Sequence, residues 1–400
     1  MRSLVLLLAF VAPLAACGGG GGGSAAAPDI EAPPAQPGPV DPPADPQAAS
    51  LAGHWLLESG SMLPTFIKGL ATWTTTTDVT ALTVGADGLA KVWFRDRLTD
   101  AITSLRAFVL YDGETIVLDF SAEPTSDVAS NIDIEQYMFL FPYVVVQEDA
   151  LGVADEDGRI ALFSRQTELP EDVVAGQLQV LEEHDDVPRP QFFTDLVLYN
   201  NDLVYASDQG FLERFDPGTG LLLSPLANTQ SRLPQTVQGS HFWTHCGCGG
   251  SRDAYRRSLG TVYDTVSSES EMGGPITFRA MAYVPNTDRL WLHGRAFDDQ
   301  FGRFYVMNTL SEPDVVETTV PFNRDLRALA VDGAFFWGLI TVGSQAVVLI
   351  DPTTGRVTAS YEVPDENVSW NGLVVVGNDL WLVGTDLLGG GRLVRVAQPD

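Results

Sequence analysis

The sequence predicts an all-β protein that consists of two β modules behind an N-terminal leader and linker. Short apolar or alternating runs are separated by Asp87-Gly88, Asp112-Gly113 and Asp157-Gly158, residues that tolerate the positive φ of tight hairpins. No segment after the leader keeps a helical hydrophobic period for more than about two turns. A repeat of about 45 residues begins near residue 190 and is not found before it. We therefore expect a non-repeating β domain over 51–170 and a repeating one over 177–400.

The first seventeen residues have the pattern of an export signal. Arg2 supplies the positive charge, and Leu4 to Leu14 form an apolar stretch too short to remain as a membrane-spanning helix. Leu14-Ala15-Ala16-Cys17 resembles the lipobox of bacterial lipoproteins, in which the cysteine is acylated and becomes the first residue of the mature chain. The resemblance implies a signal peptide over 1–16, lipid on Cys17 and, because Gly18 follows, an outer membrane as destination. The alternative is an ordinary signal peptide that leaves Cys17 as a thiol.

Residues 17–50 are expected to be a disordered tether. Six consecutive glycines are followed by a segment with eight prolines and no aromatic residue. This composition cannot bury a core, and it gives a flexible start and a stiffer continuation. Lipid on Cys17 is the only membrane anchor that we expect, and it places the protein in the cell envelope, facing the periplasm or the surface.

The charge balance excludes one class of partner. The formal net charge is −29, and Lys68 and Lys91 are the only lysines. Because a chain with this much negative charge repels phosphate backbones and anionic headgroups, we expect no nucleic-acid partner. The acidic balance is equally consistent with salty surroundings and with a GC-rich genome.

The repeat in 177–400 predicts a β-propeller. The segment 212–220, which ends in Asp216-Pro-Gly-Thr-Gly, returns 135 residues later as 347–355, which ends in Asp351-Pro-Thr-Thr-Gly. A period of about 45 residues holds four short strands, the size of one blade. Aromatic strand positions keep this period at Phe242-Trp243, Leu290-Trp291, Phe336-Trp337 and Leu380-Trp381. The five expected blades start near Phe192, Thr236, Phe278, Leu326 and Asn371.

The last repeat ends after three strands, with Leu393–Val396 as its final one. We expect Gln177–Leu181 to supply the missing outer strand and so close the ring. The Asp-Pro-x-Thr-Gly turns are similar to those of quinoprotein-like and surface-antigen propellers. Quinone enzymes of that kind have more blades and a docking tryptophan motif, which this sequence lacks, so we expect no cofactor.

The domain over 51–170 resembles a lipocalin-like barrel. Gly53-His54-Trp55 matches the Gly-x-Trp start of such families, strands alternate with Asp-Gly hairpins, and Arg165 lies late enough to pack over Trp55. The alternative is two or three degenerate blades of one larger propeller. A barrel of this size either holds a small apolar ligand or is filled by side chains, and the aromatic residues favour an ordinary core.

One short cluster carries metal-ligating or redox side chains. His241, His245, Cys246 and Cys248 lie within eight residues and have donors for zinc or copper. Cys-x-Cys suits a single tetrahedral ion poorly, and an exported protein most simply oxidises a nearby pair. A Cys246–Cys248 disulfide is therefore favoured over a metal site or free redox-active thiols.

Polar residues of the inner propeller strands are the candidate ligand site. We expect the following six to line the central channel: Asp195, Gln238, Arg279, Asp325, Arg327 and Asn371. Two carboxylates among them keep a five-bladed glycosidase open, whereas the simpler expectation is that the group hydrogen-bonds around the axis. The acidic runs 155–157, 182–186 and 298–299 are expected to be solvated loops rather than calcium sites.

Two classes of function follow from these observations. The favoured one is a non-catalytic binding or scaffold lipoprotein whose partner is a protein, a glycan or an envelope component. The alternative is an envelope enzyme, either a glycosidase acting through channel carboxylates or a metal or thiol redox protein acting through Cys246 and Cys248. No nucleophilic hydrolase motif is present.

Overall fold

The computed structural model describes residues 48–60, 77–120, 138–141, 143–154, 158, 160–191, 194–226, 232–246, 253–257, 262–267, 276–296, 302–309, 316–322, 324–340 and 345–399. The described residues form strands and turns, with one short 3-10 turn at Ala48–Leu51. This confirms the predicted all-β class. The signal sequence, Cys17 and most of the expected tether lie outside the described residues. No helix in the described part of the chain is long and apolar enough to cross a membrane.

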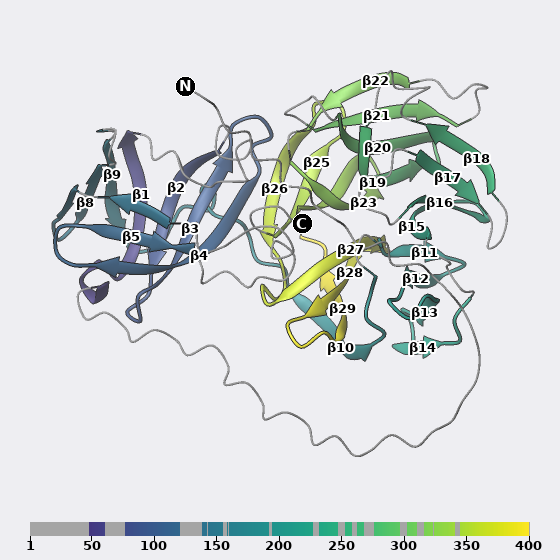
Figure 1. Ribbon diagram of the computed structural model, residues 1–400, viewed down its shortest axis with the longest axis horizontal. Coiled ribbons are helices and arrows are strands. Elements are labelled where there is room, and N and C mark those ends of the chain that lie inside the picture. Colours follow the sequence, from purple (N-terminus) through teal and green to yellow (C-terminus); the bar gives the residue numbers. More distant parts are fainter. Residues whose placement is uncertain are drawn as a thin grey trace, which may run out of the picture. The chain divides into compact units, whose positions relative to one another are not determined.

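The first module is one nine-stranded antiparallel sheet that is nearly closed into a barrel (Figure 1). Its order is β6-β5-β4-β3-β2-β1-β9-β8-β7. β6, which pairs with β5, and β7, which pairs with β8, are the two end strands of this order. The strands are β1 (Gly53–Gly60), β2 (Thr77–Val84), β3 (Leu89–Asp96), β4 (Ile102–Tyr111), β5 (Ile116–Asp119), β6 (Met138–Phe141), β7 (Tyr143–Val146), β8 (Ala150–Ala154) and β9 (Ile160–Gln166).

The interior of this sheet is one hydrophobic cluster that contains Trp55, Phe94 and Phe163. The predicted contact between Arg165 and Trp55 is present, with the guanidinium carbon 4.3 Å from the ring centroid. Arg165 also donates to the carbonyls of Ala52 and Glu148, at 2.6 and 2.8 Å. The pair therefore fastens β9 to the start of β1.

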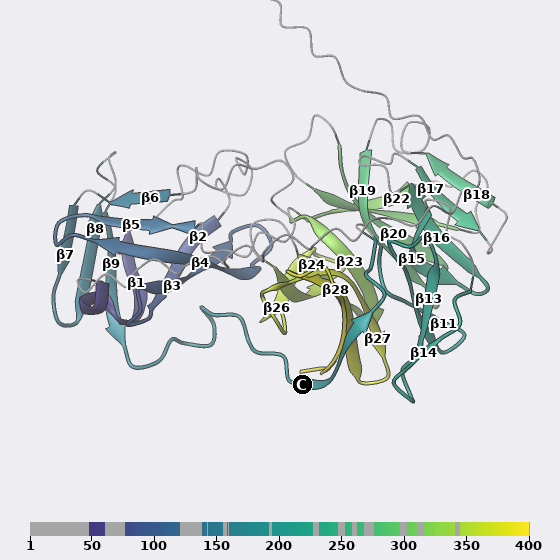
Figure 2. The same ribbon diagram turned by 60° about the horizontal axis from the view of Figure 1, so that its bottom comes forward.

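The second module is a ring of five four-stranded antiparallel sheets, a propeller-like arrangement (Figures 1 and 2). The innermost strands contact one another in the order β11, β15, β19, β23, β27 and again β11. The first three sheets are β11 (Val197–Tyr199), β12 (Asp202–Ala206), β13 (Leu212–Asp216), β14 (Leu221–Leu223); β15 (Arg232–Gln238), β16 (His241–Cys246), β17 (Asp253–Arg257), β18 (Val262–Ser267); and β19 (Ile276–Val284), β20 (Arg289–Ala296), β21 (Arg303–Asn308), β22 (Val316–Pro321). The other two are β23 (Leu326–Asp332), β24 (Phe335–Ile340), β25 (Ala346–Asp351), β26 (Arg356–Glu362); and β27 (Val368–Val376), β28 (Asp379–Asp386), β29 (Gly391–Ala397) with β10 (Val180–Val187).

The aromatic residues that mark the repeat pack between sheets. Trp243 and Trp337 are buried, and each indole donates to an acceptor at the end of the preceding strand, Gln238 or Asp332. Trp291 contacts Phe336 of the next sheet edge to face, with ring centroids 5.0 Å apart. The repeat of about 45 residues in the sequence therefore corresponds to the regular packing of aromatic side chains between the sheets of the ring.

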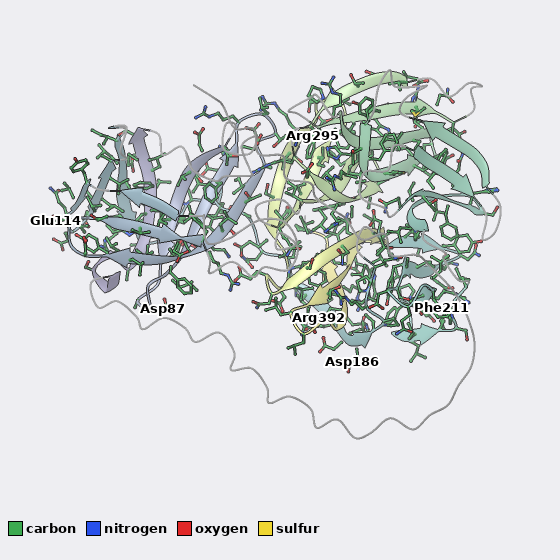
Figure 3. The ribbon with its side chains drawn as sticks, in the orientation of Figure 1. Asp87, Glu114, Asp186, Phe211, Arg295 and Arg392 are labelled. Atoms are coloured by element: carbon green, nitrogen blue, oxygen red, sulfur yellow. The ribbon has the colours of Figure 1, made fainter. Side chains whose placement is uncertain are left out.

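The closing strand is β10, which pairs with β29 as the outer strand of the last sheet. The expected bounds were too early, because only Val180 and Leu181 of the predicted segment lie in β10. The expectation that the acidic run 182–186 is a solvated loop was also wrong. Arg392 of β29 pairs with Glu183 and Asp185 at 2.9 and 3.0 Å, so acidic side chains suit this strand. Figure 3 shows Arg392 and Asp186 on this part of the ring.

The two Asp-Pro-x-Thr-Gly turns have the same geometry. The carboxylate of Asp216 accepts hydrogen bonds from the Gly218 amide and the Thr219 hydroxyl, at 2.8 and 2.7 Å. Asp351 accepts equivalent bonds from Thr353 and Thr354. These hydrogen bonds lower the pKa of both carboxyls, and each turn ends in a glycine at positive φ. The motif is a structural turn.

Specific contacts join the barrel-like sheet to the ring, and Ala44–Asp400 forms one compact unit. The buried side chain of Arg324, which precedes β23, lies 3.5 Å from the buried carboxylate of Asp96 at the end of β3. Lys91 of β3 pairs with Glu362 of β26 at 2.5 Å. The segment after β9 packs Ala175 against Trp93 on the outer face of the sheet.

Candidate ligand site at the propeller axis

Four innermost strands carry a β-bulge at the same point of the repeat. In β15, β19, β23 and β27, one residue has no register partner on the neighbouring strand. These residues are Gln235, Arg279, Arg327 and Asn371. A bulge leaves one residue outside the ladder and re-aims its side chain. The repeat therefore sets a polar side chain at one level of each of four blades, and we call these four residues the bulge ring.

Asp195 supplies the equivalent polar residue of the first blade, just before β11. Its carboxylate is fully buried and accepts hydrogen bonds from the amides of Leu196, Leu373 and Leu329, at 2.7, 3.0 and 3.3 Å. Leu373 belongs to β27 and Leu329 to β23, so one side chain links three blades. The Asp195 amide donates to the Pro234 carbonyl of β15 at 3.1 Å, which adds a fourth.

Burial raises the pKa of the Asp195 carboxyl well above its usual range, although the three amides act in the opposite direction. The backbone around it is also tightly packed. A Cβ on Gly372 would lie 2.3 Å from the Leu196 nitrogen, so only glycine fits there. Asp195 is therefore part of the structure of the ring and is not exposed to a ligand.

A second group of ionisable side chains lies beside Arg279. His293 of β20 is fully buried, and burial lowers its pKa to about 4. The charge of Arg279 acts in the same direction, whereas the charge of Asp325 opposes it. The imidazole is therefore neutral near pH 7. Its Nε2 lies 3.4 Å from the Phe322 carbonyl oxygen, between the rings of Phe304 and Phe322.

The structure places the six predicted channel residues in four kinds of position, of which that of Asp195 is described above. Arg279, Arg327 and Asn371 are in the bulge ring, and Arg327 and Asn371 are buried. Asp325 is half-buried just before β23, close enough to His293 for its charge to act on the imidazole.

Gln238 lies three residues past the bulge of β15 and has a different role. Its side chain accepts from the Trp243 indole at 3.0 Å and donates to the Thr309 hydroxyl at 3.2 Å. It joins two neighbouring blades, and Gln235 holds the position in the bulge ring. Asp195 and Asp325 therefore do not form a pair of exposed carboxylates, because Asp195 has no solvent-accessible surface.

Sequence reasoning missed Gln235 and His293. Gln235 is 1 % exposed and aligns with Arg279, Arg327 and Asn371 in the repeat, so this alignment would have found it. His293 lies on a second strand, and nothing in its sequence neighbourhood distinguishes it from an ordinary strand residue.

The described part of the His/Cys cluster spans the whole of β16. His241 and Cys246 are the first and last residues of that strand, and Cys248 lies outside the described residues, so the proposed disulfide is not tested. Within the described ranges, no group of three or more His, Cys, Asp or Glu side chains is arranged to hold a metal ion.

Comparisons with known proteins give weak likenesses. No protein-family model and no curated protein matches the sequence. Among solved structures, the chain is similar to Myxococcus xanthus glutaminyl cyclase, with a TM-score of 0.39 and 15 % identity over 56 % of this chain and 100 % of that one. It is also similar to Kuenenia stuttgartiensis hydrazine synthase, with a TM-score of 0.31 and 14 % identity over 51 % of this chain and 58 % of that one. A third similar structure is a chain of a nidogen/laminin complex, with a TM-score of 0.32 and 9 % identity over 61 % of this chain and 89 % of that one. Scores this low carry no argument about function.

The chemistry available at the axis is hydrogen bonding. The bulge ring offers two amides and two guanidinium groups, the nearby imidazole is neutral, and the Asp195 carboxylate holds backbone amides. Acid–base catalysis of glycoside cleavage needs two carboxyl groups that both reach the substrate. Of the two predicted channel carboxyl groups, Asp325 is half-buried and Asp195 is fully buried.

Proposed function

We propose that this protein is a non-catalytic binding or scaffold lipoprotein of the cell envelope, held on the outer membrane by lipid on Cys17. Its partner is a protein, a glycan or another envelope component. The barrel-like module is of the lipocalin-like type and the ring is a propeller of the quinoprotein-like or surface-antigen type. No cofactor is part of the proposal.

The observation that carries the proposal is that the Asp195 carboxylate binds backbone amides of the ring. A carboxylate that a glycosidase would need at the axis is buried and accepts hydrogen bonds from three backbone amides. The other axial side chains are amides, arginines, a neutral histidine and the half-buried carboxyl group of Asp325, which has no accessible carboxyl partner among the predicted channel residues. A ring fixed in this way is a rigid support for a binding surface, while the lipobox and the Gly/Pro-rich linker supply an anchor and reach.

Two measurements test the proposal. Mass spectrometry of the mature N-terminal peptide should find acylated Cys17, and the C17S variant should leave the membrane fraction. An unmodified thiol at Cys17 would contradict the anchor.

The enzyme alternative is tested by Asp325→Asn, because Asp325 is the accessible member of the predicted carboxylate pair. The purified protein should release no sugar from envelope glycans, with or without this change. Hydrolysis by the wild type that Asp325→Asn abolishes would establish the glycosidase.

A further inference from the structure

The outer face of β7, β8 and β9 carries an exposed apolar patch. In the register of these strands, Tyr143 lies opposite Ala154, which lies opposite Ile160. One step along, Val145 lies opposite Gly152, which lies opposite Leu162. The exposed fractions of Tyr143, Val145, Ile160 and Leu162 are 70, 61, 59 and 49 %. These four side chains, which we call the β7–β9 patch, are neighbours on one face of the sheet.

Other outward apolar residues of the barrel-like sheet are covered by a neighbouring segment of the chain. Ala81, Trp93 and Ile102 are 0, 6 and 8 % exposed because residues 169–175 of the chain pack over them. Contiguous exposed apolar surface in a soluble domain marks an interaction site more often than single exposed residues do. Among the described residues, no segment covers the β7–β9 patch in the same way.

The patch also borders a sheet edge. In the described part of the chain, β7 pairs with β8 and with no strand on its other side. Pro142 precedes β7 and has no N–H to donate, which limits pairing at that end. An edge of this kind accepts an added strand from another chain, whose alternate side chains then continue the apolar face.

The charges around the patch select the partner. Glu148 and Asp149 are exposed in the turn that follows β7, and Glu58 is exposed on β1 beside Ser164 of β9. The nearby basic side chain of Arg165 stacks on Trp55 and donates to two carbonyls. Among the described residues the rim is therefore acidic, and complementarity requires a basic partner.

Two other occupants are disfavoured by the same charges. A second copy of the chain would set acidic rim against acidic rim. An anionic bilayer would be repelled by the rim and by a chain of net charge −29.

We infer that the β7–β9 patch and the β7 edge form a docking surface for a protein segment in extended conformation, with alternate apolar residues in the centre and lysine or arginine on both flanks. This inference rests on the proposed binding function and names the partner's chemistry. Apolar contact provides the affinity, and the charged flanks set orientation and the rate of encounter.

The test uses the full chain with C17S, so that no lipid is attached, and two fluorescent synthetic peptides. Both have the same alternating valine and tyrosine centre, and one is flanked by lysines and the other by glutamates. Fluorescence anisotropy should show binding of the lysine-flanked peptide alone. The double variant V145E/L162E should weaken that binding about tenfold or more.

The matched control is Leu388→Glu, at a leucine that is 97 % exposed in the β28–β29 turn, far from the patch in sequence. It should bind the peptide as the parent does, and all variants should keep the parent's Tm because the altered positions are exposed. Equal binding of both peptides, or equal loss in the control and the double variant, would overturn the inference.

Two further outcomes would also overturn it. One is concentration-dependent dimerisation, measured by sedimentation, that V145E/L162E abolishes, since the occupant would then be a second copy. The other is binding of the C17S chain to phosphatidylethanolamine–phosphatidylglycerol vesicles that the same variant abolishes. If a cellular partner is captured equally well by V145E/L162E, the docking surface is wrong while the proposed binding function stands.

Discussion

The carboxylate of Asp195 holds three blades of the ring together through backbone amides. Asp195→Ala would leave three buried backbone amides without their acceptor, and each unsatisfied group costs about 1–3 kcal/mol. We expect a loss of about 3–5 kcal/mol in the free energy of unfolding, measured by urea denaturation. Asp195→Asn keeps one acceptor oxygen and should lose less. A loss under about 1 kcal/mol for Asp195→Ala would contradict the role assigned to the carboxylate.

His293 should make stability depend on pH. Its pKa is lowered from 6.5 to about 4 in the fold, so the unfolded chain binds a proton first as pH falls. The contribution of the neutral His293 side chain to the free energy of unfolding is fully present above pH 6.5. It is lost as the pH falls to about 4, and it is on the order of 3 kcal/mol in all.

The measurement is urea denaturation at a series of pH values. His293→Gln should flatten this part of the profile, whereas His54→Gln, at a half-buried histidine of β1, should retain it. An unchanged slope in His293→Gln would assign the pH dependence to other groups.

At the residue scale, the sequence predicted the axis in part. Strand periodicity was enough to place Arg279, Arg327 and Asn371 on the inner strands. Strand periodicity could not show which end of β15 carries the bulge. Gln238 was therefore predicted as the channel residue, whereas Gln235 occupies the position in the bulge ring. The burial of Asp195 was not predictable either, because two of the three amides that donate to its carboxylate belong to residues more than a hundred positions away.

At the element scale, the closing strand shows what a local pattern cannot reveal. The run 182–186 has no apolar alternation, and on its own it resembles a solvated loop. It becomes a strand because β29 offers Arg392 and Arg395, and Arg395 pairs with Glu182 at 3.0 Å. The partner strand lies about two hundred residues away, so the pairing depends on the closure of the whole ring.

This pairing predicts a local effect of one substitution. Arg392→Met should remove the ion pairs to Glu183, Asp185 and Asp365 and leave three acidic groups close together. Hydrogen exchange of the β10 amides should become faster by about tenfold, while the β23 amides should change little. Raised salt should reduce the difference, because these pairs are partly exposed. Equal acceleration in β10 and β23 would instead indicate global destabilisation.

At the scale of the whole molecule, the barrel-like sheet and the ring share a buried ion pair. Arg324→Met would leave the Asp96 carboxylate without its cation, although that carboxylate keeps hydrogen bonds from Leu98 and Thr99. Loss of one member of a buried pair costs about 3–5 kcal/mol.

Calorimetry should therefore show a lower transition temperature for Arg324→Met. The double variant R324M/D96N should recover part of the loss, because no buried charge remains uncompensated. A double variant that is less stable than Arg324→Met by the full cost of Asp96→Asn alone would show that the two residues are not coupled.

The central claim is that the chain binds a partner at the envelope and does not catalyse a reaction. The most direct measurement is quantitative mass spectrometry of proteins captured with the lipidated chain from intact cells after reversible cross-linking. We predict that the wild type and Asp325→Asn enrich the same partner equally and that C17S loses it. The claim would be contradicted if the wild type enriched nothing while the purified protein cleaved a glycan that Asp325→Asn left intact.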